Sequence, residues 1–182
     1  MRVSSTIGGK SYTPQPLIDV PFGTRIAANR VNQERGSRML PMATLVEALG
    51  GKKILKRRIA NLEDLREAVK AGLPYASLEA LISKFGLARD EAATALHLPH
   101  RTIARRKKEQ RLQADESDRV LRLAQVSALA VATLGNEEKA ALWLRRPNRA
   151  LGNQPPLQLL DNNIGTRQVE EVLGRIAHGT IS

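Results

Sequence analysis

The fold is decided by the stretch from Arg89 to Lys108, which reads RDEAATALHLPHRTIARRKK. Residues 89–96 follow the apolar spacing of a short helix. A second, densely basic helix is expected from His100, directly after a proline. Only three residues, His97-Leu98-Pro99, separate the two. Two short helices joined by a tight turn, the later one basic, are typical of a helix-turn-helix.

Helical spacing continues on both sides of this stretch. We expect helices over about residues 41–49, 62–71, 77–85, 115–134, 137–146 and 166–178, with a short helical turn beginning at Pro155-Pro156. Asn61, Asn136 and Thr166 are the predicted N-caps of three of them. Residues 52–58 could form a short strand or a helix. Strand signals are scarce elsewhere, so the predicted class is all-α with at most one short strand.

The positions of proline and glycine, together with local composition, predict four segments. Residues 1–40 contain scattered proline and glycine without periodicity, which indicates an extended N-terminal arm. Residues 41–72 form an N-terminal helical segment, residues 73–112 the helix-turn-helix region and residues 113–182 a helical C-terminal domain. The apolar surface of residues 115–134 is too broad for an exposed helix, so we expect it in the core and in part of a dimer contact.

The excess of positive charge is not spread evenly along the chain. Its 182 residues include 29 Lys and Arg against 18 Asp and Glu, a net charge of +11. Residues 1–70 carry 13 basic and 6 acidic side chains, residues 71–112 carry 8 and 4, and the remainder carries 8 of each. The first two parts therefore favour an anionic partner such as nucleic acid. Aromatic residues make up 3%, which argues against binding single strands by base stacking.

Catalysis is not indicated. The chain has no cysteine and three histidines without metal-ligand spacing, so neither a thiolate nor a zinc site is expected. The carboxylates of Asp115, Glu116 and Asp118 lie where a helix begins and are explained as N-terminal caps. We expect no enzyme activity, no cofactor and no metal. The sequence shows no targeting or membrane-spanning segment, which predicts a cytoplasmic protein without a membrane partner.

The basic helix that begins at His100 carries the predicted DNA contacts. Ile103 is its one large apolar residue and is expected to face inward. Outward arginines could reach guanine edges, while lysine and threonine would contact phosphates. The predicted DNA-binding set is Arg101, Thr102, Arg105, Arg106, Lys107 and Lys108. The alternative is a solvated basic face without a nucleic-acid partner.

Several blocks in order along the chain point to one family. They are Gly72-Leu73-Pro74, Arg101-Thr102-Ile103-Ala104-Arg105-Arg106, Glu116-Ser117-Asp118-Arg119, Trp143-Leu144 with Pro147-Asn148 and Leu151-Gly152, and Gly165 with Arg175-Ile176-Ala177-His178-Gly179. With these blocks, about residues 50–182 resemble the Xre/MbcA/ParS antitoxins.

The resemblance implies a fold and partners. Such proteins have an Xre-like helix-turn-helix followed by a small helical toxin-binding domain, and they pair with a RES-domain toxin that consumes NAD or transfers ADP-ribose from it. They are usually dimeric, and their toxin complex binds its own promoter. Carried over, the toxin-binding residues would be Trp143, Asn148, Leu151, Gly152, Arg175, Ile176, His178, Gly179 and Ile181. The end of the last helix would then occlude the toxin's active site.

Two other interpretations stay open on the sequence. The chain could be a plain helix-turn-helix transcriptional regulator without a toxin partner, its C-terminal helices serving only to dimerise. It could also be a basic protein associated with RNA or the ribosome. A toxic neighbouring reading frame that this chain neutralises would distinguish the antitoxin from both.

Overall fold

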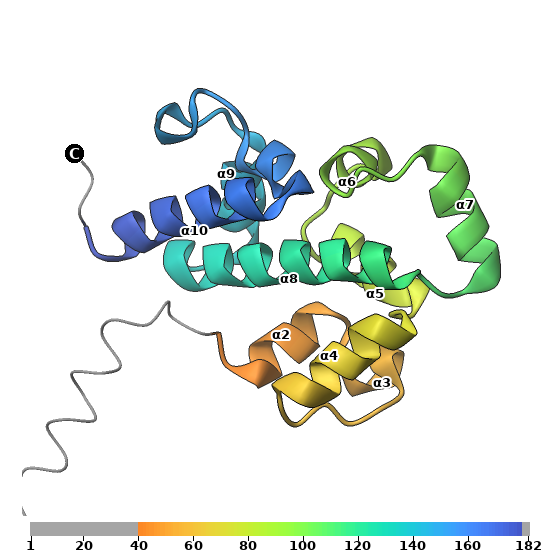
Figure 1. Ribbon diagram of the computed structural model, residues 1–182. Coiled ribbons are helices and arrows are strands. Elements are labelled where there is room, and N and C mark those ends of the chain that lie inside the picture. Colours follow the sequence, from red (N-terminus) through yellow and green to blue (C-terminus); the bar gives the residue numbers. More distant parts are fainter. Residues whose placement is uncertain (1–39, 180–182) are drawn as a thin grey trace, which may run out of the picture. The chain divides into compact units, whose positions relative to one another are not determined.

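The structure, a computed structural model, describes residues 40–179, which belong to one compact unit (Figure 1). The predicted arm, apart from Leu40, and the predicted toxin contact Ile181 lie outside the described residues. Within residues 40–179 the chain is all-α without a strand, which confirms the predicted class. The helices are α2 (Met42–Ala48), α3 (Gly51–Leu55), α4 (Leu62–Ala71), α5 (Tyr75–Lys84), α6 (Arg89–Ala95), α7 (His100–Glu109), α8 (Ala114–Leu134), α9 (Glu137–Arg145), the 3₁₀ turns η1 (Arg149–Leu151) and η2 (Pro156–Asp161), and α10 (Asn163–Ala177).

Helix α8 is the central element of this unit. Helices α2 and α4 pack on one side of it and α9 and α10 on the other (Figure 1). Its inward side chains, among them Val120, Leu123 and Val126, are fully buried. The expectation that this helix forms the core is therefore confirmed, and its part in a dimer contact stays a prediction. Helix α8 contacts both α7, through the Arg106–Glu116 pair, and α10.

Two of the three predicted caps are confirmed. The side chain of Asn61 accepts a hydrogen bond from the Asp64 N–H, and that of Asn136 from the Lys139 N–H, both at 2.8 Å. Thr166 does not cap the last helix, because α10 begins three residues earlier. The cap is Asn162, whose side chain accepts from the N–H groups of residues 164 and 165 at 2.9 and 3.0 Å. The Thr166 hydroxyl instead donates to the Asn162 carbonyl at 2.8 Å.

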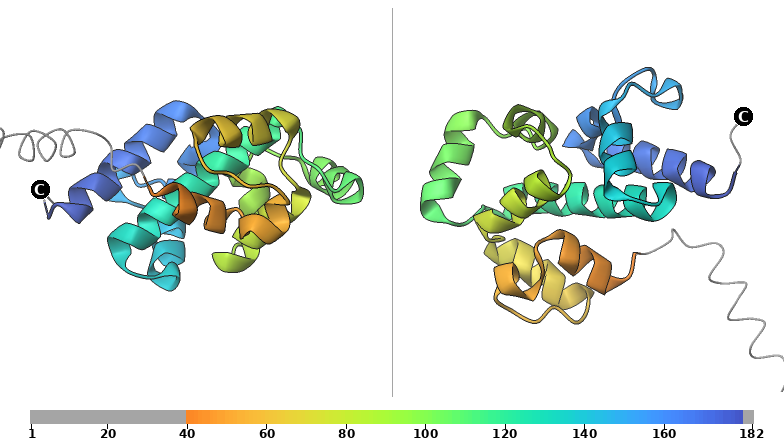
Figure 2. Two further views of the ribbon diagram at one scale, coloured as in Figure 1. Left: turned by 90° about the horizontal axis from the view of Figure 1, so that it is seen from below. Right: turned by 180° about the vertical axis from the view of Figure 1, so that it is seen from behind.

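Residues 52–58, for which strand and helix were both open, begin as the short helix α3. The helical turn at Pro156 is also present as η2. The predicted divisions after residues 40, 72 and 112 stay predictions. Figure 2 shows the same helices from below and from behind.

Candidate nucleic-acid interface and partner surface

Helix α7 exposes most of its side chains. Four of the six predicted DNA contacts, Arg101, Arg105, Lys107 and Lys108, are exposed, and Thr102 is half-buried. Surface pairs engage two of the cations: Arg105 Nε lies 4.0 Å from a Glu109 carboxylate oxygen, and Lys107 Nζ lies 3.8 Å from Glu79. Exposed pairs of this length contribute little, so they leave the side chains available to another anion.

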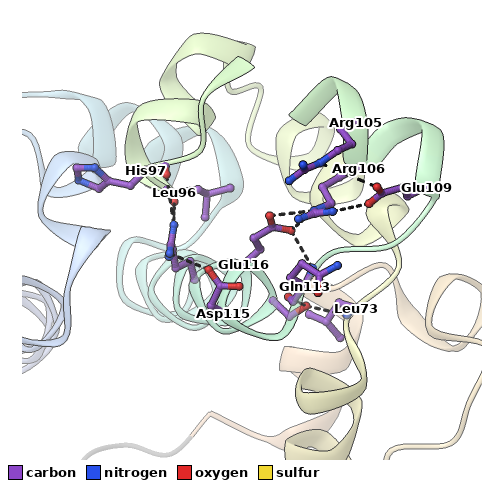
Figure 3. Close-up of polar contacts among 11 residues, drawn as sticks. Leu73, Leu96, His97, Arg105, Arg106, Glu109, Gln113, Asp115 and Glu116 are labelled. Carbon is purple, nitrogen blue, oxygen red and sulfur yellow. Dashed lines mark hydrogen bonds and ion pairs between the residues drawn. The ribbon is translucent and has the colours of Figure 1, made fainter. Parts of the chain in front are cut away.

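Arg106 corrects the sequence prediction, because it does not face solvent. It is 6% exposed, and its Nε donates to both carboxylate oxygens of Glu116, at 2.9 and 2.7 Å (Figure 3). Its Nη1 donates to Glu109. These hydrogen bonds, first to Glu116 and then to Glu109, raise the pKa of Arg106 above its usual value. Residues three apart share a helix face, so Arg106 lies on the inward face of Ile103.

Glu116 joins α7 to the start of α8. Besides Arg106 it accepts a hydrogen bond from the Gln113 N–H at 2.8 Å, which satisfies one of the free amides where α8 begins (Figure 3). Its predicted capping role is confirmed. Its second role, neutralising a buried arginine on another helix, was not predicted. The neighbouring hydroxyl of Ser117 accepts from the Leu73 N–H at 2.8 Å and donates to the Gln113 carbonyl at 2.7 Å.

Arg119 fixes the turn between α6 and α7. Its Nη1 donates to the carbonyls of Leu96 and His97, at 3.0 and 3.3 Å, and its Nη2 to Asp115 at 3.0 Å. His97 has a φ of +46°, in the left-handed region that few residues other than glycine adopt. A guanidinium on the carbonyls at this point stabilises the turn, since these groups lie beyond the last hydrogen bonds of α6. The sequence block containing Arg119 was recognised, but its contact was not.

The far end of α7 is also held. The helix ends at Glu109, and the carbonyl of the next residue, Gln110, accepts from the Tyr75 N–H at 3.1 Å. The Leu112 N–H then donates to the Leu73 carbonyl at 2.9 Å. A side chain at Gly72 would place a Cβ 2.2 Å from the Leu112 carbonyl oxygen, so only glycine allows this approach. Helix α7 is therefore fixed at both ends and in the middle while its outer face stays exposed.

The C-terminal region forms a second surface beside the η1 loop. Asn148 shapes the loop, because its side chain accepts from the Ala150 N–H at 2.9 Å and its own N–H donates to the Gln154 carbonyl at 3.1 Å. One open groove lies between this loop and α10, and a second lies along the C-terminal end of α10 itself. One is lined by Ala150, Leu151, Gly152, Gln154, Leu159, Gln168, Glu171 and Arg175, and the other by Glu171, Gly174, Arg175 and His178.

These grooves bring together four of the predicted toxin contacts: Leu151, Gly152, Arg175 and His178. Leu151 is largely buried, so its main contribution is to the floor of the groove. The remaining members lie elsewhere. Trp143 and Ile176 are half-buried against the core, Gly179 is exposed beyond the end of α10, and Asn148 holds the loop. Their contact with a partner stays a prediction.

Polar contacts connect the C-terminal region to the helix-turn-helix. Arg145 of α9 donates through Nη2 to the Phe85 carbonyl at 3.2 Å and to the Gly86 carbonyl, and its Nε lies 3.2 Å from the Glu91 carboxylate. From η2, a carboxylate oxygen of Asp161 lies 3.3 Å from Nε2 of His97. The turn before α7 is therefore contacted from both α8 and η2.

Residues 40–179 contain no group of three or more His, Asp or Glu side chains that could hold a metal ion. No helix in that range combines the length and the apolar composition needed to cross a bilayer.

Two family models match consecutive parts of the chain. Residues 64–125, which contain α6, the turn and α7, match the antitoxin Xre-like helix-turn-helix domain. Residues 129–179, which contain both grooves, match the antitoxin Xre/MbcA/ParS C-terminal toxin-binding domain. The chain belongs to the Xre/MbcA/ParS antitoxin family. The family resemblance predicted from the sequence blocks is confirmed, and the buried Arg106–Glu116 pair falls within its helix-turn-helix domain.

Curated relatives of the family agree. An "Antitoxin Xre" of Pseudomonas putida is 42% identical over 83 residues, 45% of this chain and 52% of that protein. The "Antitoxin Xre" of Yersinia enterocolitica is 28% identical over 120 residues, 65% of this chain and 81% of the relative. The "Antitoxin Xre" of Photorhabdus laumondii is 43% identical over 70 residues, which are 38% of this chain and 47% of that protein. The matched part thus spans about half the length of the Pseudomonas and Photorhabdus relatives.

Proposed function

We propose that this chain is the antitoxin of a toxin–antitoxin pair, which binds promoter DNA through α7 and a protein toxin through the surface between the η1 loop and α10. The DNA-binding part of this proposal is supported by the contacts that hold α7 in place. Arg106, Arg119 and the 72–75 segment fix the helix, and the outward Arg101 and Arg105 stay exposed. Fixed arginines at the start of a basic helix suit bidentate contacts to guanine in the major groove.

The toxin-binding part of the proposal is supported by the family match and by the two grooves. The match to a toxin-binding domain covers residues 129–179, and the grooves on this part of the chain are lined by Arg175 and His178 beside Glu171. The partner that the family resemblance implies is a RES-domain toxin acting on NAD. Carboxylates on the toxin beside its NAD-binding cleft would be complementary to Arg175 and His178. The antitoxin then needs no chemistry of its own, because filling that cleft is enough to stop turnover.

The decisive experiment is co-expression with the neighbouring reading frame of the same operon. We expect that frame to be toxic when expressed alone and harmless when this chain is present. The double variant R175D/H178D should fail to protect at equal abundance, whereas R167D should protect, since Arg167 is exposed on the same helix and lines neither groove. A neighbour that is not toxic would instead favour a plain helix-turn-helix regulator.

DNA binding is tested with the wild-type chain on three probes. A duplex of the operon's own promoter should bind more tightly than an unrelated duplex of equal length, by about 1000-fold or more at physiological salt. A structured RNA of equal charge should compete no better than the unrelated duplex. Tight binding to RNA with no preference for the promoter would overturn the assignment of α7 and favour an RNA partner.

Assembly is part of the same proposal. A helix-turn-helix protein that dimerises binds two half-sites about one helical turn apart, so a palindromic operator is expected. Light scattering should give the mass of a homodimer, and of a hetero-oligomer once the toxin is added. A strict monomer at high concentration, alone and on DNA, would contradict this part.

A further inference from the structure

A second basic surface lies outside the helix-turn-helix match, on α3 and the chain after it. We call it the α3 basic surface. Its members share exposure and positive charge within seven consecutive residues, and they are Lys52, Lys53, Lys56, Arg57 and Arg58. The apolar residues of the same stretch turn inward, with Leu55 buried and Ile54 and Ile59 half-buried. Five exposed cations thus lie within one short segment of the chain.

Nearby carboxylates do not neutralise this surface. Arg57 lies 3.7 Å from Glu67, and both side chains are exposed. Within residues 40–179, no acidic side chain lies within ion-pair distance of Lys52, Lys53, Lys56 or Arg58. The acids of the adjoining helix are otherwise engaged: Glu63 pairs with Arg66 at 2.7 Å, and Asp64 accepts from the Ala60 N–H at 2.8 Å.

The α3 basic surface is connected to α7 through one helix. Helix α3 packs against α5, and α5 is joined to α7 by the Tyr75 N–H on the Gln110 carbonyl and by the Glu79–Lys107 pair. Figure 1 and the right-hand view of Figure 2 place α3 and α7 away from the end of the unit where α10 finishes. Helices α3 and α7 are therefore held in a fixed relation through α5, both away from that end of the unit.

We propose that the α3 basic surface binds backbone phosphates of the same duplex that α7 reads, outside the bases that α7 contacts. This inference rests on the proposed DNA-binding function and extends its footprint. Lysine and arginine on flexible stems suit phosphates, which give affinity without sequence preference. Residues 40–72 contain no aromatic side chain, so the surface lacks the stacking platforms of single-strand binders.

The test compares two variants that lose the same charge. K52Q/K53Q/K56Q/R58Q removes the uncompensated cations of the α3 basic surface. K139Q/R146Q/R149Q/R167Q removes four exposed cations of the C-terminal region and serves as the control. Affinity for the promoter duplex and for an unrelated duplex is measured from low to physiological salt. Each lost phosphate contact lowers the slope of log K against log salt by about 0.9.

We expect the first variant to lose about 2 to 4 in that slope and to bind both duplexes about 10- to 100-fold more weakly, with their affinity ratio unchanged. The control should stay within about threefold of wild type. Both should keep the wild-type Tm because all substituted side chains are exposed. If the first variant unfolds, the smaller change K52Q/K53Q is used instead. It is expected to lower the slope by about half as much as the quadruple variant, about 1 to 2.

The outcomes separate this inference from the proposed function. A wild-type chain that binds no duplex overturns both. If wild type prefers its promoter and the α3 variant binds duplexes as well as the control does, only the role of the α3 basic surface is overturned. An α3 variant that loses RNA or toxin binding while keeping duplex affinity also overturns it, and it assigns the surface to that partner.

Discussion

Helices α7 and α10 are both amphipathic and both carry a predicted contact surface, yet they are held in opposite ways. The only side chain that α7 buries fully is Arg106, which is neutralised by Glu116 and Glu109. Helix α10 buries a stripe that includes Val169, Val172 and Leu173. The first is positioned by ion pairs and backbone contacts at a few points, the second by apolar packing along its length.

The difference agrees with the two functions proposed for these helices. A helix that enters a DNA groove must be free on most of its circumference, so it cannot bury an apolar stripe and needs discrete polar supports. A helix that forms one wall of a protein-binding groove gains from a continuous apolar back. The two surfaces should therefore fail differently when they are mutated.

The largest effect is expected at the back of α10. In G165A the new Cβ would lie 2.1 Å from the Leu159 carbonyl oxygen, so the backbone of η2 or α10 must move. We expect a loss of about 2–3 kcal/mol in the free energy of unfolding by denaturant titration. G174A is the control on the same helix, since its Cβ meets nothing within 4 Å. It should gain about 0.5–1 kcal/mol. Equal stabilities would contradict the close approach.

A smaller loss is expected when the support of α7 is weakened. E116Q keeps the shape of the side chain but removes the charge that faces the buried Arg106. The Tm should fall by about 4–6 °C, because an arginine is left without its main partner. Amide hydrogen exchange should rise in α7 more than in α10. E138Q removes an exposed carboxylate of α9 and should change neither. Uniform loss of protection in both helices would show that α7 is not separately supported.

A third variant addresses the turn rather than the helix. R119A removes the donor to the Leu96 and His97 carbonyls and should lower affinity for the promoter duplex about fivefold, about 1 kcal/mol. The Tm should change by less than about 2 °C because the side chain is partly exposed. R122A, one turn along α8, is the control and should bind as wild type does. A wild-type affinity in R119A would remove its positioning role.

The smallest effect concerns pH. Burial raises the pKa of Glu170 on α10, and Arg167 lowers it by a lesser amount. Since the folded pKa lies above the unfolded one, the stabilising contribution of Glu170 is complete below the unfolded pKa and is lost as the pH rises through the folded value. E170Q should therefore be slightly more stable than wild type at pH 7, and this advantage should vanish in acid. Comparing denaturation at pH 7 and pH 4 checks it; an advantage only in acid would contradict the sign.

Much of this architecture could be predicted from the sequence, because local signals determine it. Helix spacing and short polar caps located α6, α7 and the starts of α4 and α9. The cap of α10 was misplaced because Asn162 and Thr166 are both good caps, and only packing shows which one begins the helix.

The supports of α7 were missed in the sequence analysis, although one of them, Arg106, carries a local signal. Arg105 and Arg106 are the same residue type, side by side in a basic helix. Only the spacing of three residues between Ile103 and Arg106 indicates that Arg106 lies on the inward face. The Arg119 contact joins residues 22 and 23 positions apart, for which no periodic signal exists. The α3 basic surface was visible as a charge run, but its exposure and lack of neutralising acids required the packed structure.

The outward arginines of α7 are proposed to read DNA independently of the surface proposed to neutralise a toxin. The most direct measurement determines, for R101A/R105A, both the affinity ratio between promoter and unrelated duplex and the protection of cells that express the toxin. The ratio should fall about 1000-fold or more, to near 1, with protection as in wild type. K107Q/K108Q should weaken both duplexes alike and leave the ratio intact. Promoter preference retained in R101A/R105A, or protection lost together with it, would contradict the account.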